Sequence, residues 1–252
     1  MSNKPKINRI LLAVSFLMII ALAVLVLPEI SEKRSVSADT NSANITMRKT
    51  SKTYHYGNME IMKFTIEYPE VKGAAAKINV EIAAQVAAYV KEAEKTYQKA
   101  IELYEEAIQE GYPFYPWEAY IKYQITNNTN GLLSLYVDDY IYSGGAHGGT
   151  VRTSTTWDLA KGTQRTLDSF FKPNADYRNL VLGIILRQAQ YNLEQDPDTM
   201  YFDDYQDLIK KNFNPQSFYL TPNGLVIYYQ QYEVGPYAAG IIEFTIPYEQ
   251  IR

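Results

Sequence analysis

The sequence has no cysteine and only two histidines, His55 and His147, in 252 residues. The absence of cysteine excludes disulfides, zinc–thiolate sites, iron–sulfur clusters and thiol catalysis. Two histidines cannot form a three-histidine metal site. A phosphate-binding loop, a dinucleotide-binding glycine pattern, a nucleophile elbow and an HExxH motif are also missing. We therefore expect neither a metal ion nor a cofactor.

Positive charge is also scarce, with 24 basic residues against 28 acidic ones and a net charge of −4. This balance argues against a nucleic-acid partner, which would require a basic face. Residues 39–252 carry 19 basic and 26 acidic residues, a net charge of −7. Such a domain attracts basic partners and repels anionic polymers, although ordinary solubility explains the charge equally well. The 23 tyrosines suit half-buried sheet faces, protein interfaces or sugar-stacking surfaces.

One long apolar run lies near the N-terminus, at residues 10–27, where Ser15 is the only polar residue. A helix of this length spans about 27 Å, close to the thickness of a bilayer core. Basic residues precede the run, which predicts a cytoplasmic tail at 1–9 and a single-pass membrane protein with the remainder outside the cell. The alternative is a signal peptide cleaved after Ala38, which would release a secreted protein.

The residues after the run are predicted to form a linker and then one domain. Residues 28–52 are rich in Ser, Thr, Asn and Lys, which is typical of a linker. The domain is expected over 53–252, with an N-terminal part ending at residue 150 and a C-terminal part beginning at 151. Apolar residues recur every three or four positions over 78–108, which predicts an amphipathic helix lying on a sheet and ending at Gly111.

Alternating apolar and polar residues predict strands along the rest of the domain. The expected strands cover 59–68, 120–125, 132–142, 150–159, 163–167, 217–220, 225–232 and 241–246. Shorter helices are expected over 175–193, capped by Asn174, and over 203–212. Because helices and hairpins segregate, the predicted class is α+β, with antiparallel sheets packed against one long and one or two shorter helices after an N-terminal transmembrane helix.

A glycine-rich stretch around His147, at 142–149, is the most distinctive motif. It lies between two predicted strands, so it offers no helix N-terminus to a phosphate group and favours a bulged connection. His147 is then structural, ligand-contacting or catalytic. The acidic run at 196–207 does not have the spacing of a calcium-binding loop and suits helix N-termini instead.

Several motifs together resemble a family of exported bacterial domains. The motifs are the stretches at 142–149, 157–162, 167–171, 218–225, 232–240 and 244–248. The family includes the extracellular part of lysozyme-sensing anti-sigma-V factors (RsiV-type) and the N-terminal half of peptidoglycan deacetylases (PdaC-type). The resemblance covers roughly residues 50–250. It implies a membrane-tethered binding or sensor domain that recognises a lysozyme-like muramidase or a cell-wall component.

The sequence differs from both relatives in what surrounds this domain. Nine residues before the apolar run are too few for a sigma-binding segment, and no deacetylase domain follows, so we expect a non-enzymatic protein. The ligand-contacting residues are expected in two loops and are Tyr142, Ser143, Gly144, Gly145, His147, Pro236 and Tyr237.

The alternative function is an enzyme acting on cell-wall glycan or peptide. Glycan hydrolysis needs a pair of carboxylates, and the candidates are Asp138 or Asp139, Asp158 and Glu233. Adjacent residues of a regular strand point to opposite faces, so Asp138 and Asp139 cannot serve one site together.

Overall fold

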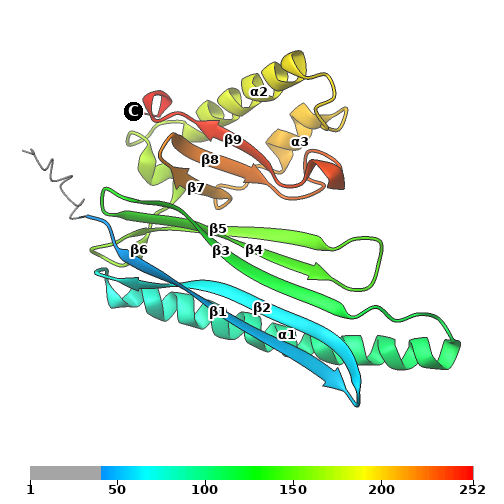
Figure 1. Ribbon diagram of the computed structural model, residues 1–252. Coiled ribbons are helices and arrows are strands. Elements are labelled where there is room, and N and C mark those ends of the chain that lie inside the picture. The colour runs from blue at the N-terminus through cyan, green and yellow to red at the C-terminus, as the bar shows by residue number, and fades with distance from the viewer. Residues whose placement is uncertain (1–40, 252) are drawn as a thin grey trace, which may run out of the picture. The chain divides into compact units, whose positions relative to one another are not determined.

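The computed structural model describes residues 41–251, which form two packed β-sheets with helices on their outer faces (Figure 1). The predicted tail, apolar run and Ala38 cleavage site lie outside the described residues. Within 41–251, no helix is both long and apolar enough to cross a membrane.

The first sheet has six strands in the order β1-β2-β3-β4-β5-β6. Its elements are β1 (Asn44–Tyr56), β2 (Met59–Lys72), α1 (Ala76–Glu110), β3 (Trp117–Thr129), β4 (Leu132–Tyr142), β5 (Gly149–Asp158) and β6 (Thr163–Gln164). The β2–β3 pair is parallel and the other pairs are antiparallel, so the prediction of antiparallel sheets is corrected at this one pair. The reason is α1, which carries the chain back along the sheet and lets β3 start beside the start of β2.

The predicted linker over 28–52 extended too far, because its last part belongs to β1. This strand lies at the edge of the sheet, and nearly all its side chains are exposed. Its sequence therefore contains few apolar residues and resembles that of a polar linker. Cross-strand ion pairs hold it to β2, including one of 2.7 Å between Lys49 Nζ and Glu67 Oε1.

The long helix α1 was correctly predicted and packs on one face of the first sheet, as Figure 1 shows. Its apolar stripe meets the inward-facing residues of β2, β3 and β4. Gly111 ends the helix in a left-handed conformation with φ of 78°. Near the other end, Glu81 accepts hydrogen bonds from Trp157 Nε1 at 3.1 Å and from Gln164 Nε2 at 2.9 Å.

The C-terminal part forms a three-stranded antiparallel sheet, β7-β8-β9, with two helices on its outer face (Figure 1). Its elements are η1 (Leu167–Phe170), α2 (Tyr177–Gln195), α3 (Tyr205–Lys211), β7 (Phe218–Thr221), β8 (Gly224–Tyr229), η2 (Tyr237–Ala239), β9 (Ile242–Ile246) and η3 (Tyr248–Gln250). The predicted strand at 163–167 is only two residues long. The predicted cap of α2, Asn174, is also corrected, because the Asp176 carboxylate accepts the hydrogen bond from Asn179 N.

The two sheets meet through a seam of polar groups centred on Arg152 of β5. Its guanidinium binds both carboxylate oxygens of Asp138, at 2.6 and 2.8 Å, and also contacts Glu243 of β9. The ring centre of Tyr136 lies 3.7 Å from the same guanidinium. Ser134 Oγ accepts a hydrogen bond of 2.9 Å from Leu220 N across the seam. These bonds fix the second sheet against the face of the first sheet opposite α1.

Candidate functional site

The two loops predicted to bind a ligand meet at the surface. The ring of His147, from the β4–β5 loop, stacks on the ring of Tyr237 in η2, with centroids 3.8 Å apart and an angle of 20° between the planes. His147 is exposed and Tyr237 is half-buried. Residues 90 positions apart in the sequence thus form one aromatic pair, which we call the His147–Tyr237 surface.

Two glycines allow these loops to pack as they do. A β-carbon at Gly148 would overlap the ring of Tyr140, and one at Gly235 would overlap the carbonyl oxygen of Met200. Only glycine allows such close approach. His147 Nδ1 lies 2.9 Å from the carbonyl oxygen of Gly148, so this nitrogen carries the donated proton and Nε2 is the acceptor in the neutral ring. The backbone therefore sets both the position and the tautomer of His147.

The other predicted site residues divide between two places. Pro236 directly precedes η2 and so adjoins Tyr237. Tyr142 lies at the end of β4, opposite Glu118 of β3, and Ser143 and Gly145 follow it as exposed loop residues.

Gly144 lies at the base of the same loop, in a left-handed conformation with φ of 83°. A β-carbon there would lie 3.4 Å from the Tyr115 carbonyl oxygen. The structure therefore groups His147, Pro236 and Tyr237, while Gly144 packs towards the start of β3.

Tyr232, the first residue of the motif at 232–240, is a further surface residue that was not among the predicted ligand contacts. Its ring centroid lies 6.1 Å from that of Tyr237, and 56% of the residue is exposed. Its φ is +67°, an uncommon value for a bulky residue and one that costs free energy. Such strain often accompanies a binding role. Its positive φ could not be predicted from the sequence, because glycine or asparagine is the usual residue at such a position.

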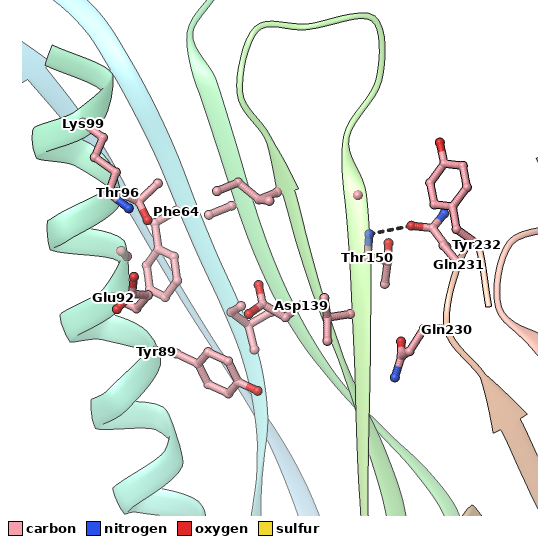
Figure 2. Close-up of a pocket in the computed structure, with 16 residues that line it drawn as sticks. Phe64, Tyr89, Glu92, Thr96, Lys99, Asp139, Thr150, Gln230, Gln231 and Tyr232 are labelled. Carbon is pink, nitrogen blue, oxygen red and sulfur yellow. Dashed lines mark hydrogen bonds between the residues drawn. The ribbon is translucent and has the colours of Figure 1, made fainter. Parts of the chain in front are cut away.

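A cavity of about 530 Å³ lies beside this surface, between α1 and the sheet (Figure 2). We call it the helix–sheet cavity. Figure 2 shows side chains from α1 on one side, residues 230–232 on the other, and Asp139 of β4 between them. Burial raises the pKa of the Asp139 carboxyl, and the negative charge of Glu92 on α1 raises it further. A carboxylate in such a place is disfavoured unless a ligand compensates its charge.

The carboxylates considered for glycan hydrolysis do not converge. Asp138 points to the seam and binds Arg152, whereas Asp139 points to the cavity, as strand alternation predicted. Asp158 accepts hydrogen bonds from the backbone N–H groups of Ala160 and Lys161. Glu233 accepts one from Gln230 N. The described part of the chain contains no group of three His, Asp or Glu residues placed to hold a metal ion.

The fold and these features define an α+β domain with two sheets, an exposed aromatic surface made by two loops, and an adjoining cavity. Residues 56–150 match the family described as "Deacetylase PdaC" and residues 168–249 match the family described as "Protein of unknown function (DUF3298)". Together these matches confirm the resemblance to the RsiV/PdaC type of domain. The first match ends at residue 150 and the second begins at residue 168, whereas β5 and β6, which lie almost entirely after the predicted boundary at 150, belong to the first sheet.

Two curated relatives come from Bacillus subtilis strain 168. The peptidoglycan-N-acetylmuramic acid deacetylase PdaC is 22% identical over 205 residues, which is 78% of this chain and 41% of the relative. The anti-sigma-V factor RsiV is 31% identical over 131 residues, which is 51% of this chain and 45% of the relative. The chain therefore spans less than half the length of either protein.

Two crystal structures of DUF3298 family proteins share the fold. The one from Bacteroides fragilis superposes with a TM-score of 0.66 at 21% identity, covering 84% of this chain and 92% of the other. The one from Pseudomonas aeruginosa gives a TM-score of 0.56 at 17% identity, covering 82% of this chain and 92% of the other.

Proposed function

We propose that this protein is a non-enzymatic recognition module held on the outer face of the cell membrane by the apolar run at 10–27. It binds a lysozyme-like muramidase or a cell-wall component. The meeting of His147 and Tyr237 is the observation that carries this proposal. Their stacked rings offer apolar area with polar edges, and the bonded, closely packed loops reduce the cost of ordering them on binding.

Charge and relationship favour a basic protein as the ligand. Residues 39–252 carry a net charge of −7, which speeds the approach of a positively charged enzyme such as lysozyme. The relative named as an anti-sigma factor and the relative named as a peptidoglycan deacetylase share this domain type. The second of these names places the domain type in a protein that acts on peptidoglycan, which supports a role in recognition at the cell wall.

Replacing Tyr237 with alanine tests the proposal. We expect the affinity of the full chain for immobilised lysozyme to fall by about tenfold or more, because an aromatic anchor of an interface is lost. A matched control is Tyr191→Ala, which removes a tyrosine of α2 that is 59% exposed and far along the chain from both loops. The urea midpoint of unfolding should be nearly the same for both variants as for the wild type. Equal affinity of wild type and Tyr237→Ala would remove this surface from the proposal.

The alternative function is an enzyme acting on cell-wall glycan or peptide, and the helix–sheet cavity is the feature that favours it. A half-buried carboxyl of raised pKa, such as Asp139 near the charge of Glu92, is the arrangement of a general acid with its partner. The measurement is release of reducing ends or amines from purified peptidoglycan by the full chain. Release that is abolished in Asp139→Asn would support the enzyme, and no release from either protein would support the recognition module.

A further inference from the structure

The helix–sheet cavity has walls of two kinds. Its floor is apolar and is made by side chains of the sheet, namely Phe64, Ala119, Ile121, Ile141 and Val151. Val151 is 59% exposed and Ile141 37%, so this part of the sheet is not covered by α1. Tyr89 and Tyr232 stand on opposite sides of the cavity (Figure 2). A ligand with an aliphatic portion would bury these groups.

Asp139 is the half-buried charged group of the floor, and no residue of the described range 41–251 donates a hydrogen bond to it or pairs with it. Within residues 41–251, its carboxylate has no ion pair and no hydrogen-bond donor, whereas Asp138 has two bonds from one guanidinium. Glu92 is held by Lys95, whose Nζ lies 2.7 Å away, and the charge of Lys99 also acts on Glu92. Neither lysine is among the groups that shift the pKa of Asp139. The charged groups that line the cavity are therefore Glu92, Lys99 and Asp139, and the Asp139 carboxylate on the apolar floor has no ion pair.

The group that complements this cavity is a cation on an aliphatic stem. The stem covers the apolar floor, and the positive charge pairs with Asp139 in surroundings where water screens the pair weakly. Aromatic rings at the walls add attraction for a cation. Lysine and arginine side chains have this chemistry.

We infer that the helix–sheet cavity receives a lysine or arginine side chain of a protein bound at the His147–Tyr237 surface. Tyr232 joins the two places, because it lines the cavity and its ring lies 6.1 Å from the ring of Tyr237. A protein resting on Tyr237 therefore has the cavity mouth beside it. The acidic charge of residues 39–252 favours a basic partner. The inference rests on the proposed function for the identity of the occupant, but the cavity can be tested alone.

The first arm of the test uses a small probe and the full chain in a mild detergent. The probe is Nα-acetyl-lysine methylamide, and binding is followed by the methyl resonances of Ile141 and Val151. We expect saturable shifts with wild type and about tenfold weaker binding to Asp139→Asn, as for loss of a charge-assisted contact. The probe acetylated at Nε should cause no shift. Asp207→Asn, which removes a carboxylate that is 85% exposed, is the matched control and should bind like wild type.

The second arm uses immobilised lysozyme. Asp139→Asn should weaken binding about fivefold or more, and Tyr237→Ala should weaken it independently. No methyl shifts with the lysine probe, or equal affinity of wild type and Asp139→Asn for it, would overturn the inference even if Tyr237→Ala still abolished lysozyme binding. Conversely, probe binding without any lysozyme binding would leave the cavity as a cation site and reject lysozyme as the partner. Tighter binding of free diaminopimelate than of the lysine probe would indicate that the occupant of the cavity is an amine of the cell wall and not a protein side chain.

Discussion

Asp138 and Asp139 are neighbours in β4, yet they are placed in opposite electrostatic surroundings. Asp138 faces Arg152 in the seam between the sheets. Asp139 faces the helix–sheet cavity, where burial and Glu92 raise its pKa. Alternation along the strand predicted the opposite directions, but not the different partners, because those come from α1 and β5. Asp139 destabilises the folded state when it is ionised, and its presence despite this cost points to a role in binding.

Asp139→Asn should therefore stabilise the protein at neutral pH. The pKa of Asp139 is higher in the folded state than in the unfolded state, so its contribution is favourable at low pH and is lost as the pH rises through the folded-state pKa. The other ionisable groups of the cavity are Tyr89, Glu92 and Lys99 from α1 and Tyr232; the lining residues of β2, β3 and β5 are uncharged.

The measurement is urea denaturation of wild type and Asp139→Asn at pH 7 and near pH 3. The urea midpoint of the variant should be higher at pH 7 and equal to that of wild type near pH 3. A lower midpoint at pH 7 would contradict the placement of Asp139 as an unpaired carboxylate.

At the scale of elements, α1 is tied to the sheet at its first turns by Glu81. The indole N–H of Trp157, which is fully buried, donates to this carboxylate, and so does Gln164. These hydrogen bonds lower the pKa of Glu81, so their stabilising effect is lost as the pH falls through its folded-state pKa.

Glu81→Ala should cost about 1–3 kcal/mol of unfolding free energy, because the buried indole N–H loses its acceptor. Glu81→Gln keeps an acceptor oxygen and should cost less. Glu102→Ala, at an exposed position of the same helix, should change stability little. Urea denaturation at pH 7 measures all three. A loss in Glu81→Ala no greater than in Glu102→Ala would show that the Trp157 contact contributes nothing.

The elements differ in how far the sequence could predict them. The 35-residue helix α1 has an apolar stripe because one face lies on the sheet, so its pattern is plain. The edge strand β1 buries almost nothing and therefore looked like a linker. The stacking of His147 on Tyr237 joins loops of two different sheets, and the φ of Tyr232 depends on its surroundings. Local periodicity carries no information about either. The motifs marked both loops, and the fold was needed to bring them together.

At the scale of the whole described domain, Arg152 joins the two sheets. Its side chain is 9% exposed, and it contacts Asp138 in the first sheet and Glu243 in the second. Burial lowers the pKa of the Arg152 guanidinium, but the hydrogen bond and charge of Asp138 outweigh this effect and raise it above its usual value. The guanidinium therefore stays charged at neutral pH.

Arg152→Ala should destabilise the domain by about 3 kcal/mol or more, because two carboxylates are left in the seam without their cation. Arg165→Ala, which removes a guanidinium bonded to Ser169, is the control and should cost far less. Thermal and urea denaturation of the full chain measure the difference. A loss in Arg152→Ala below about 1 kcal/mol would show that the apolar contacts alone hold the sheets together.

The seam also matters for the proposed binding surface, since it sets where Tyr237 lies relative to His147. His147 belongs to a loop of the first sheet, and Tyr237 follows β8 of the second. The His147–Tyr237 surface thus depends on the docking of one sheet on the other. The central claim is that this surface is used to recognise a basic protein.

The most direct test is binding of the full chain to immobilised lysozyme over a range of salt concentrations. The account predicts that binding weakens as the salt concentration rises, because charge attraction contributes to it. It also predicts that a chitooligosaccharide bound in the lysozyme cleft competes with this protein for lysozyme. Folded protein that fails to bind lysozyme even at low salt would contradict the claim.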